Sequence, residues 1–348
     1  MAALTQRPSL QVRIRAAAPG EGHAVAALWR ELWDAHEDWG GYPGSHDPRV
    51  YAQLAERLDD DARVRDGQPI LGRHVHLVAD YGDVPCGQVE GWFERHGIDT
   101  TTPFTCEVRS LVVSRRMHRF GAGRMLLDAL AASVRLLARG ERSVLAAEVL
   151  EPNPGYAFYM RVGYAPVSWN ARIDALAGAN IAPGSCRARP AIVHDALPVA
   201  RLEGTLAARR RAAGDLRFDR PRALDATLVS AVAIRLGSVT PLSLRDPATI
   251  VAVDPSGTVR AAASFTMHAL EPPFMPVRRA LLGRFALDPA FAAAPLVAPL
   301  VTLASRIACA EGATHLELTD LSAPGTELHT AALAAGAVPW SRVVQKPA

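Results

Sequence analysis

The sequence of 348 residues is poor in lysine and in cysteine. Only one of its 38 basic residues, Lys346, is a lysine, and the four cysteines lie far apart. None of them forms a Cys-x-x-Cys pair or has a histidine at the spacing of a zinc site. These cysteines are Cys86, Cys106, Cys186 and Cys309. The pattern excludes a disulfide framework, and we predict no metal site.

Long apolar runs and blocks of like charge are also missing. The longest uncharged run, residues 289–305, is interrupted by prolines and is too short to cross a bilayer as a helix. The N-terminus has no apolar core of signal-peptide length. The net charge of +3 is spread along the chain and forms no concentrated basic region. We therefore expect a cytoplasmic protein without membrane or nucleic-acid partners, and the oligomeric state stays open.

The composition is that of a globular protein, with 49% hydrophobic and 21% charged residues. The length favours two domains of about 170 residues each. Apolar periodicity and turn residues predict an alternation of strands and helices in the first half. The expected strands are 11–16, 74–80, 85–94, 104–113, 143–150 and 164–173, and the expected helices are 21–36, 47–60, a long helix after Gly123 that ends at Gly140, and 154–162.

The second half repeats this order of elements. The hairpin around Gly82 corresponds to the hairpin around Gly257, and Gly163 corresponds to Gly336, an offset of roughly half the chain. We therefore predict a duplicated domain, with one copy at residues 1–175, a linker at 176–190 and a second copy at 191–348. A chance alignment of two α/β domains is the alternative explanation.

A turn rich in glycine and arginine links the strand that ends at Val113 to the long helix. Backbone N–H groups at a helix start have no partners inside the helix, and the helix dipole is positive there. Glycines at 121 and 123 allow the tight turn that exposes these donors to a pyrophosphate. Further arginines, at 115, 116, 119 and 124, surround the turn. The sequence thus predicts a nucleotide-like anion site here.

This turn resembles the acyl-CoA motif of the GCN5-related N-acetyltransferase (GNAT) family, Gln/Arg-x-x-Gly-x-Gly/Ala. Six consecutive residues match it, with His118 in place of the first Gln or Arg: His118, Arg119, Phe120, Gly121, Ala122 and Gly123. The resemblance implies that these residues and Arg124 hold acetyl-CoA or another short acyl-CoA. It also implies that the backbone of the preceding strand end pairs with the pantetheine arm, at Leu111, Val112 and Val113.

A second motif of the family, Asn followed by Phe/Leu-Tyr-x-x-x-Gly-Phe/Tyr, is similar to residues 153–164. By this resemblance Asn153 contributes to cofactor binding, and Tyr159 supplies the proton that the leaving thiolate needs. A core tyrosine is the alternative for Tyr159. Glu107 is a candidate general base, and a structural ion pair with Arg109 is its alternative.

The resemblance therefore implies two tandem GNAT folds of mixed α/β (α+β) class, each a largely antiparallel sheet flanked by helices. The implied activity is transfer of an acetyl or small acyl group to a small-molecule amine. A non-catalytic acyl-CoA-binding or regulatory protein is the alternative function. A dinucleotide-binding unit is disfavoured because the third glycine of its motif is missing.

Two regions complete the predictions. The loop from His36 to Asp47 is a candidate lining of the acceptor site, although solvated loop residues are the simpler interpretation. The C-terminal copy has lost the glycine motif, because residues 291–297 contain Pro295 and neither glycine nor arginine. Ala332 stands there at the position of Tyr159. We therefore place the active site in the N-terminal copy.

Overall fold

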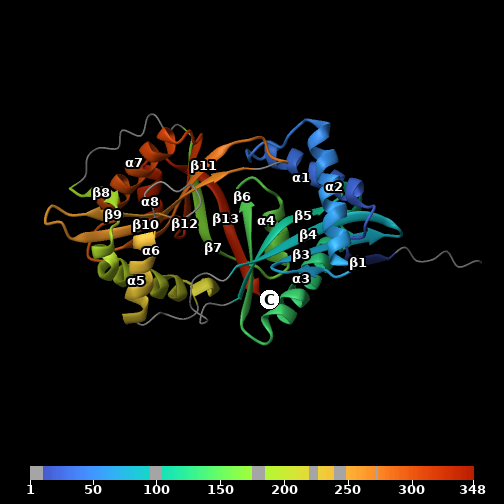
Figure 1. The fold of residues 1–348 in the computed structure, drawn as a ribbon, viewed down its shortest axis with the longest axis horizontal. Coiled ribbons are helices and arrows are strands. Elements are labelled where there is room, and N and C mark those ends of the chain that lie inside the picture. The colour runs from blue at the N-terminus through green and yellow to red at the C-terminus, as the bar shows by residue number, and fades with distance from the viewer. Residues whose placement is uncertain (1–10, 95–103, 175–184, 219–225, 239–247, 271–272) are drawn as a thin grey trace, which may run out of the picture. The chain divides into compact units, whose positions relative to one another are not determined.

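The computed structural model describes residues 11–94, 104–174, 185–218, 226–238, 248–270 and 273–348. Its contacts divide the chain into two compact units (Figure 1). The first unit contains the chain up to Glu94, residues 104–145 and Ala348, and the second contains residues 146–347. Each unit has a largely antiparallel sheet flanked by helices, which confirms the predicted mixed α/β class.

The sheet of the first unit has the strand order β1-β3-β4-β5, with the short β2 paired to β3. All of these pairs are antiparallel. The strands are β1 (Val12–Ala16), β2 (Ile70–Leu71), β3 (His74–Tyr81), β4 (Val84–Glu94) and β5 (Phe104–Val113). The predicted hairpin of β3 and β4 is confirmed, whereas β2 was not predicted because two residues are too few to show a period.

Helices cover both faces of this sheet (Figure 1). They are α1 (Gly22–Asp38), α2 (Pro48–Arg65) and α3 (Ala122–Ala138), with the 3-10 turn η1 (Arg115–Met117) before α3. Helix α3 packs so closely on β4 that a Cβ added at Gly91 would lie 2.6 Å from a methyl carbon of Leu130. Helix α1 contacts β4 and β5 and packs against α2. Alternate side chains of β4 therefore point toward α3 and away from it.

The second unit contains β6 from Ala146 onward and all later elements. Its sheet has the order β6-β13-β7-β12-β11-β10-β9-β8. The strands are β6 (Ser143–Leu150), β7 (Ala165–Ile173), β8 (Arg187–Pro190), β9 (Ala248–Val253), β10 (Val259–Ala269), β11 (Arg278–Leu287), β12 (His315–Leu321) and β13 (Val338–Pro347). The helical elements are α4 (Gly155–Arg161), η3 (Val193–Asp195), α5 (Ala196–Ala212), η4 (Leu216–Phe218), α6 (Ala226–Ser238), α7 (Ala294–Ala310) and α8 (Glu327–Ala334).

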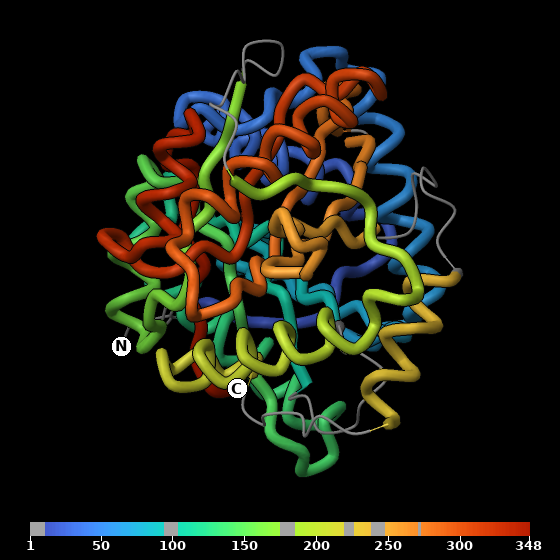
Figure 2. Tube along the Cα trace, turned by 90° about the vertical axis from the view of Figure 1, so that its left-hand side faces the viewer, coloured from blue at the N-terminus to red at the C-terminus, as the bar shows by residue number. Residues whose placement is uncertain are grey.

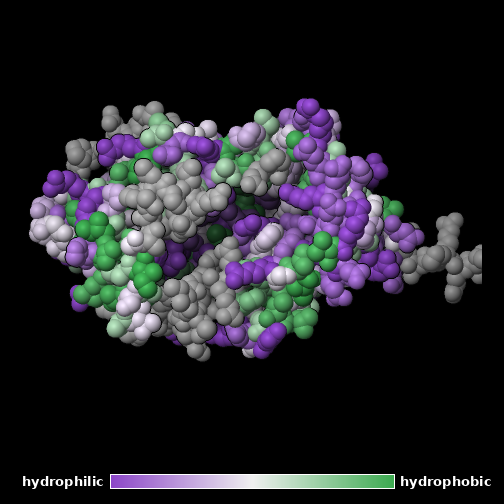
Figure 3. Space-filling model, in the orientation of Figure 1, coloured by the Kyte–Doolittle hydropathy of each residue, from purple (hydrophilic) through white to green (hydrophobic). Residues whose placement is uncertain are grey.

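Two apolar cores lie on opposite sides of this sheet, because α7 and α8 pack on one side and α5 and α6 on the other (Figure 2). Leu296 and Leu300 of α7 are fully buried in one core, and Val199 of α5 is fully buried in the other. The outer surface over α5 and α6 is partly apolar, and hydrophilic residues cover α1 and α2 of the first unit (Figure 3).

The last strand of each predicted copy lies among strands of the other copy. β13 sits between β6 and β7, and β7 sits between β13 and β12 (Figure 1). Both β13–β7 and β12–β7 pairs are antiparallel, with Val343 opposite Ser168 and Leu318 opposite Ala171. The strands are thus exchanged between the copies. For this reason the boundary between the two compact units falls inside β6. The boundaries predicted above are those of the two copies in the sequence, and they stay a prediction.

The predicted linker at 176–190 needs one correction. Residues 175–184 lie outside the described ranges, but 187–190 form β8, which pairs with β9 at the edge of the sheet. A short edge strand carries polar side chains and tolerates a proline such as Pro190, so its composition is that of a linker. The predicted helix 47–60 also extends further, to Arg65.

Residues with a left-handed backbone recur along the two copies. Ser110 and Arg284 both have positive φ, of 53° and 54°, inside the corresponding strands β5 and β11. The glycine pairs Gly40 and Gly214, and Gly163 and Gly336, also have positive φ. Each pair is separated by roughly 174 residues, which is the spacing that a duplicated chain produces.

Candidate active site

The strand before the glycine turn is distorted at its centre. Ser110 has φ of 53°, and the pairing of β5 with β4 shifts register there, so that Arg109 is opposite Glu90 and Val112 is opposite Gln88. An irregularity of this kind bends a strand and re-aims the side chains that follow. Of the three predicted pantetheine-binding residues, Val112 is buried and Leu111 and Val113 are half-buried.

The turn itself is held from both sides. His118 donates from Nε2 to the carbonyl of Val113 at 3.0 Å. On helix α1, the carboxylate of Glu31 accepts from Ser114 Oγ at 3.3 Å and from the N–H of Arg115 at 3.4 Å. His118, which departs from the family motif, therefore braces the loop, and these contacts fix the turn against β5 and α1.

The start of α3 has the features of an anion site. Arg119 and Gly121 have φ of 79° and 83°, and these left-handed conformations turn the chain sharply into the helix. No side chain caps α3 among the described residues, so the first-turn N–H groups of Ala122, Gly123 and Arg124 stay available. Gly121 is exposed, and a Cβ there would meet no atom within 4 Å. The backbone at 121 thus needs glycine for its conformation and leaves space above it.

Positive charge surrounds this helix start. The side chains of Arg115, Arg116 and Arg119 are exposed, and Arg124 is exposed beside Asp128 at 3.7 Å. Phe120 is 56% exposed and its ring lies 5.7 Å from the ring of Tyr81. Exposed guanidinium groups around free N–H donors suit a pyrophosphate, and the two rings offer an apolar surface beside it.

Glu107 forms an ion pair with Arg109, which was the structural alternative to a role as general base. Nη2 of Arg109 donates to Glu107 at 2.5 Å, and both side chains are partly exposed. The guanidinium of Arg109 also lies over the ring of Trp92, 5.9 Å from its centroid. A role of Glu107 as a general base stays a prediction.

A buried polar cluster on the face of β3 and β4 turned away from α3 was not predicted. Its members are His74, His76, Gln88, Glu90 and Arg65. Nε2 of His74 lies 3.4 Å from Oε1 of Glu90, and Nε2 of His76 lies 3.0 Å from Oε1 of Gln88. Two polar residues at alternate positions of an otherwise apolar strand are the signal that could have found this cluster.

The electrostatics of the cluster favour an ionised carboxylate. Burial alone would raise the pKa of Glu90, but the contact with His74 and the nearby His76 outweigh it and hold that pKa below its usual value. Burial lowers the pKa of His76. Gln88 is fully buried, and its Nε2 has no hydrogen-bond partner within the described residues. An orphaned amide beside a buried carboxylate is costly unless it serves a ligand.

Tyr159 and Asn153 belong to the second unit. Tyr159 lies on α4, is 9% exposed and contacts Tyr164 edge to face at 5.0 Å. Burial raises its pKa, so the hydroxyl stays protonated at neutral pH. Oδ1 of Asn153 accepts from the N–H of Gly155 at 2.7 Å and supports the start of α4.

The loop that was a candidate for the acceptor site has mainly structural contacts. Asp47 accepts from the N–H of Arg49 at 2.9 Å and caps α2, and Tyr42 is buried. Burial lowers the pKa of His36 to about 4, which makes it neutral at physiological pH. Trp39 lies against the His36 ring at 5.6 Å. Tyr42 is thus packed, whereas Asp47 and His46 lie at the surface, with 36% and 72% of their side chains exposed.

The C-terminal copy replaces the anion site by an acidic turn. Asp288 follows β11 and accepts from the N–H of Ala290 at 3.0 Å and from Arg260 at 3.1 Å. Arg260 also lies over the ring of Phe291, 4.6 Å from its centroid. The next helix, α7, has Pro295 in its first turn. A carboxylate and a missing N–H are both unfavourable for a pyrophosphate.

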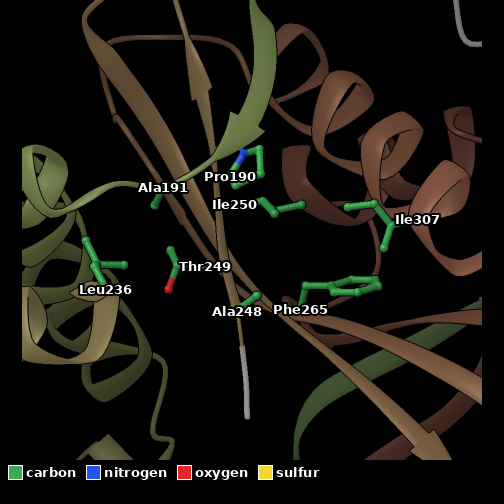
Figure 4. Close-up of a pocket in the computed structure, with 8 residues that line it drawn as sticks. All are labelled: Pro190, Ala191, Leu236, Ala248, Thr249, Ile250, Phe265 and Ile307. Atoms are coloured by element: carbon green, nitrogen blue, oxygen red, sulfur yellow. The ribbon is translucent and has the colours of Figure 1, made fainter. Parts of the chain in front are cut away.

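A small apolar pocket lies in the second unit between β8, β9, β10, α6 and α7 (Figure 4). Its volume is about 40 Å³, and apolar side chains such as Ile250, Phe265 and Ile307 line it. This volume is far smaller than that of pockets that bind small-molecule ligands.

The described residues contain no group of three or more His, Cys, Asp and Glu side chains arranged for a metal ion. None of the helices in the described ranges combines the length and hydropathy needed to cross a membrane.

Residues 26–164 match the acetyltransferase (GNAT) family. This segment includes the β3–β5 strands, the glycine turn and Tyr159. No curated protein has a significantly similar sequence.

Solved structures resemble nearly the whole chain. A GCN5-related N-acetyltransferase from Sphaerobacter thermophilus has a TM-score of 0.56 at 14% identity, with 97% of this chain and 95% of that one covered. The tandem GNAT protein from the clavulanic acid biosynthesis pathway has a TM-score of 0.50 at 17% identity, with 97% and 98% covered. At these identities the comparisons show a shared fold. Length and arginine-rich composition also suggest a likeness to the clavulanic acid protein, and that identity stays a proposal.

Proposed function

We propose that this protein is an acyl-CoA-dependent N-acyltransferase that transfers an acetyl or another short acyl group to an amine of a small molecule. The observation that carries the proposal is the start of α3, where Arg119 and Gly121 adopt left-handed conformations and the helix has no side-chain cap. The match of residues 26–164 to the acetyltransferase family supports it. An antibiotic or other secondary-metabolite pathway, by analogy with the clavulanic acid protein, is the finer proposal.

The proposed cofactor site uses the backbone more than side chains. The N–H groups of Ala122, Gly123 and Arg124 bind the pyrophosphate oxygens, and the surrounding arginines add charge. The backbone of Leu111, Val112 and Val113 pairs with the pantetheine arm, as in the family that the motif resembles. His118 supports the turn through Val113, and Phe120 contacts Tyr81 beside it.

The transfer needs a proton donor for the leaving thiolate. Tyr159 is our candidate because it stands at the tyrosine of the family motif, and burial raises the pKa of its hydroxyl, so that the proton is present at neutral pH. The acceptor amine attacks the thioester carbonyl, the C–N bond forms, the C–S bond breaks, and the thiolate takes the tyrosine proton. Asn153 supports α4, which carries Tyr159, and its contact with the cofactor stays a prediction. Glu107 stays a candidate proton acceptor.

The experiment is native mass spectrometry of the protein with acetyl-, propionyl- and succinyl-CoA, followed by a thiol-release assay with a panel of primary amines. One bound acyl-CoA per chain and amine-dependent thiol release support the enzyme. Binding without release from any amine would favour the alternative, a non-catalytic acyl-CoA-binding or regulatory protein. Absence of binding would refute both functions.

A further inference from the structure

The buried cluster on β3 and β4 lies directly beside the distorted centre of β5. Oε2 of Glu90 is 3.5 Å from the hydroxyl of Ser110, the residue with positive φ. Gln88 is opposite Val112 in the β4–β5 pairing. Both side chains therefore flank the strand segment to which the proposed function assigns the acyl-carrying arm. Glu107 lies farther along β5, on the other side of Arg109 from this segment.

Hydrogen-bond chemistry fixes the orientation of the cluster. Nη2 of Arg65 lies 2.5 Å from Nδ1 of His74. A guanidinium can only donate, so Nδ1 accepts and the proton of the neutral ring is on Nε2, which faces Glu90. Oε1 of Glu90 thus lies 3.4 Å from Nε2 of His74, in a contact that is not a hydrogen bond, and Oε2 accepts from the hydroxyl of Ser110 at 3.5 Å. Oε2 keeps a second acceptor lone pair beyond its contact with Ser110, and this is the one that a ligand can use.

The cluster reaches the surface and holds a second group that can bind a ligand. Glu90 and His74 keep 11% and 13% of their side-chain surface exposed, and Trp92 stacks on His74 with ring centroids 4.3 Å apart and is 39% exposed. The buried amide of Gln88 holds an unused donor. An anionic acceptor and a neutral donor on adjacent positions of one strand face match a cationic amine with a neighbouring oxygen.

We propose that Glu90 binds and deprotonates the acceptor amine, that Gln88 donates to an oxygen of the same molecule, and that His74 positions the Glu90 carboxylate. The acceptor class is thus a primary amine with an oxygen on a nearby carbon, such as an amino alcohol. This inference rests on the proposed function. The bound ammonium first loses one proton to solvent, and the neutral amine attacks. When its nitrogen bonds to the thioester carbon, the surplus proton passes to Oε2 of Glu90, while the breaking C–S bond leaves its electron pair on the thiolate, which Tyr159 protonates before solvent restores the tyrosine proton.

Other charged groups also act on Glu90. Arg57 and Arg65 of α2 contribute positive charge, and Arg109 is opposite Glu90 in the β4–β5 pairing. His76 of β3 lies beside Glu90 and is neutral near pH 7, because burial lowers its pKa. The arginines keep the carboxylate ionised, so that it can hold an ammonium. The pH dependence of transfer should therefore follow the ionisation of the bound amine and not that of Glu90 near neutral pH.

The experiment compares Glu90→Gln with Glu56→Gln, the same change at an exposed position of α2. The assays are thiol release from acetyl-CoA with ethanolamine as acceptor, acetyl-CoA binding, and quenching of tryptophan fluorescence by ethanolamine. Glu90→Gln should lower kcat/KM for ethanolamine by about 100-fold and leave acetyl-CoA affinity within twofold. Glu56→Gln should change neither, and Glu90→Asp should restore part of the transfer because it keeps the carboxylate.

The fluorescence readout separates this inference from the proposed function. Ethanolamine should quench the wild type, and Trp92→Phe and Glu90→Gln should each remove that quenching, whether or not acetyl-CoA binds. If ethanolamine quenches the fluorescence of the wild type but the wild type never binds acyl-CoA, the proposed function is refuted and the amine site at Glu90 is not. Transfer that survives Glu90→Gln with an unchanged KM for ethanolamine, or that is abolished by Glu107→Gln instead, would overturn the role of Glu90.

Because Glu90→Gln could also disturb folding, His74→Gln gives a second test. It should lower kcat with little change in KM, and equal activity to the wild type would contradict the positioning role.

Discussion

Arg217 donates from Nη2 to Oδ1 of Asp320 at 2.8 Å in the interior of the second unit. The same guanidinium also binds Asp215, which is almost fully buried. Burial would raise the pKa of Asp320, but the charges of Arg217 and Arg210 outweigh it and hold that pKa well below its usual range. This ion cluster joins η4 to β12.

Replacing Asp320 with asparagine should therefore destabilise the protein by about 3 kcal/mol, because Arg217 loses a buried partner. Asp174→Asn, in the exposed pair with Arg172, should cost less than about 0.5 kcal/mol. Urea denaturation at pH 7 measures both. Equal midpoints for the two variants would contradict the importance of the buried pair.

The same carboxylate predicts the acid sensitivity of the wild type. A pKa that is lower in the folded than in the unfolded protein adds stability that is present above the unfolded value of 3.8 and is lost as pH falls below it. The stability difference between wild type and Asp320→Asn should therefore be constant from pH 5 to 7 and shrink below pH 4. Denaturation curves at a series of pH values test this. A difference that does not change down to pH 3 would exclude the linkage.

Gly121 and Gly140 offer a matched pair at the two ends of α3. Both have positive φ, of 83° and 87°, and an added Cβ at either would meet no neighbour within 4 Å. Alanine at either position should cost about 1 kcal/mol of stability through backbone strain. Only Gly121→Ala should also weaken acetyl-CoA binding, by about tenfold or more, since it disturbs the helix start. Isothermal titration calorimetry distinguishes them, and an equal affinity in both variants would refute the proposed cofactor site.

Tyr159 and Tyr164 form a second matched pair, because their rings contact each other and both are buried. Tyr159→Phe should lower kcat by about 100-fold with little change in acyl-CoA affinity, whereas Tyr164→Phe should keep most of the turnover. Steady-state kinetics with a saturating amine give the comparison. If the two variants lost activity to the same extent, the effect would lie in packing and not in proton transfer.

The exchange of β7 and β13 predicts how fragments behave. A chain of residues 1–174 lacks β13, which pairs along β7 from Val338 to Gln345 in the whole protein. Such a fragment should be largely unfolded or aggregated alone, because two long strand edges are exposed. Mixing it with a fragment of residues 185–348 should restore folded structure, as followed by circular dichroism and size-exclusion chromatography. A monomeric, cooperatively folding fragment 1–174 would show that the exchange is not needed for stability.

Local sequence signals predicted the fold well where neighbouring residues determine the structure. The β3–β4 hairpin follows from alternation and from the turn at Gly82, and α3 follows from an apolar stripe that ends at Gly140. The glycine turn was predicted because its function depends on backbone conformation at consecutive residues. β8 was not predicted, since an edge strand of four residues has neither a buried face nor a period.

Features that depend on distant residues were not predictable in this way. The position of β13 between β6 and β7 depends on pairing between residues more than 150 apart, for which one sequence contains no register signal. The contact of Glu90 with His74, and of His74 with Arg65, was missed because these residues come from two strands and a helix. Glu107 was chosen instead from its place on the strand alone, and the ion pair with Arg109 shows why a polar residue on a strand has two interpretations.

The placement of β13 also matters during synthesis. β7 leaves the ribosome about 165 residues before β13 does, which at ordinary elongation rates is a delay of on the order of ten seconds. During that interval β6 and β7 have no strand between them, and their hydrogen-bonding groups are exposed to any other nascent chain. Completion of the N-terminal copy thus waits until β13, at residues 338–347, has emerged. A prematurely terminated chain lacks the strand that closes this gap, which makes chaperone binding to the nascent chain and the position of slow codons relevant to the yield of the folded protein.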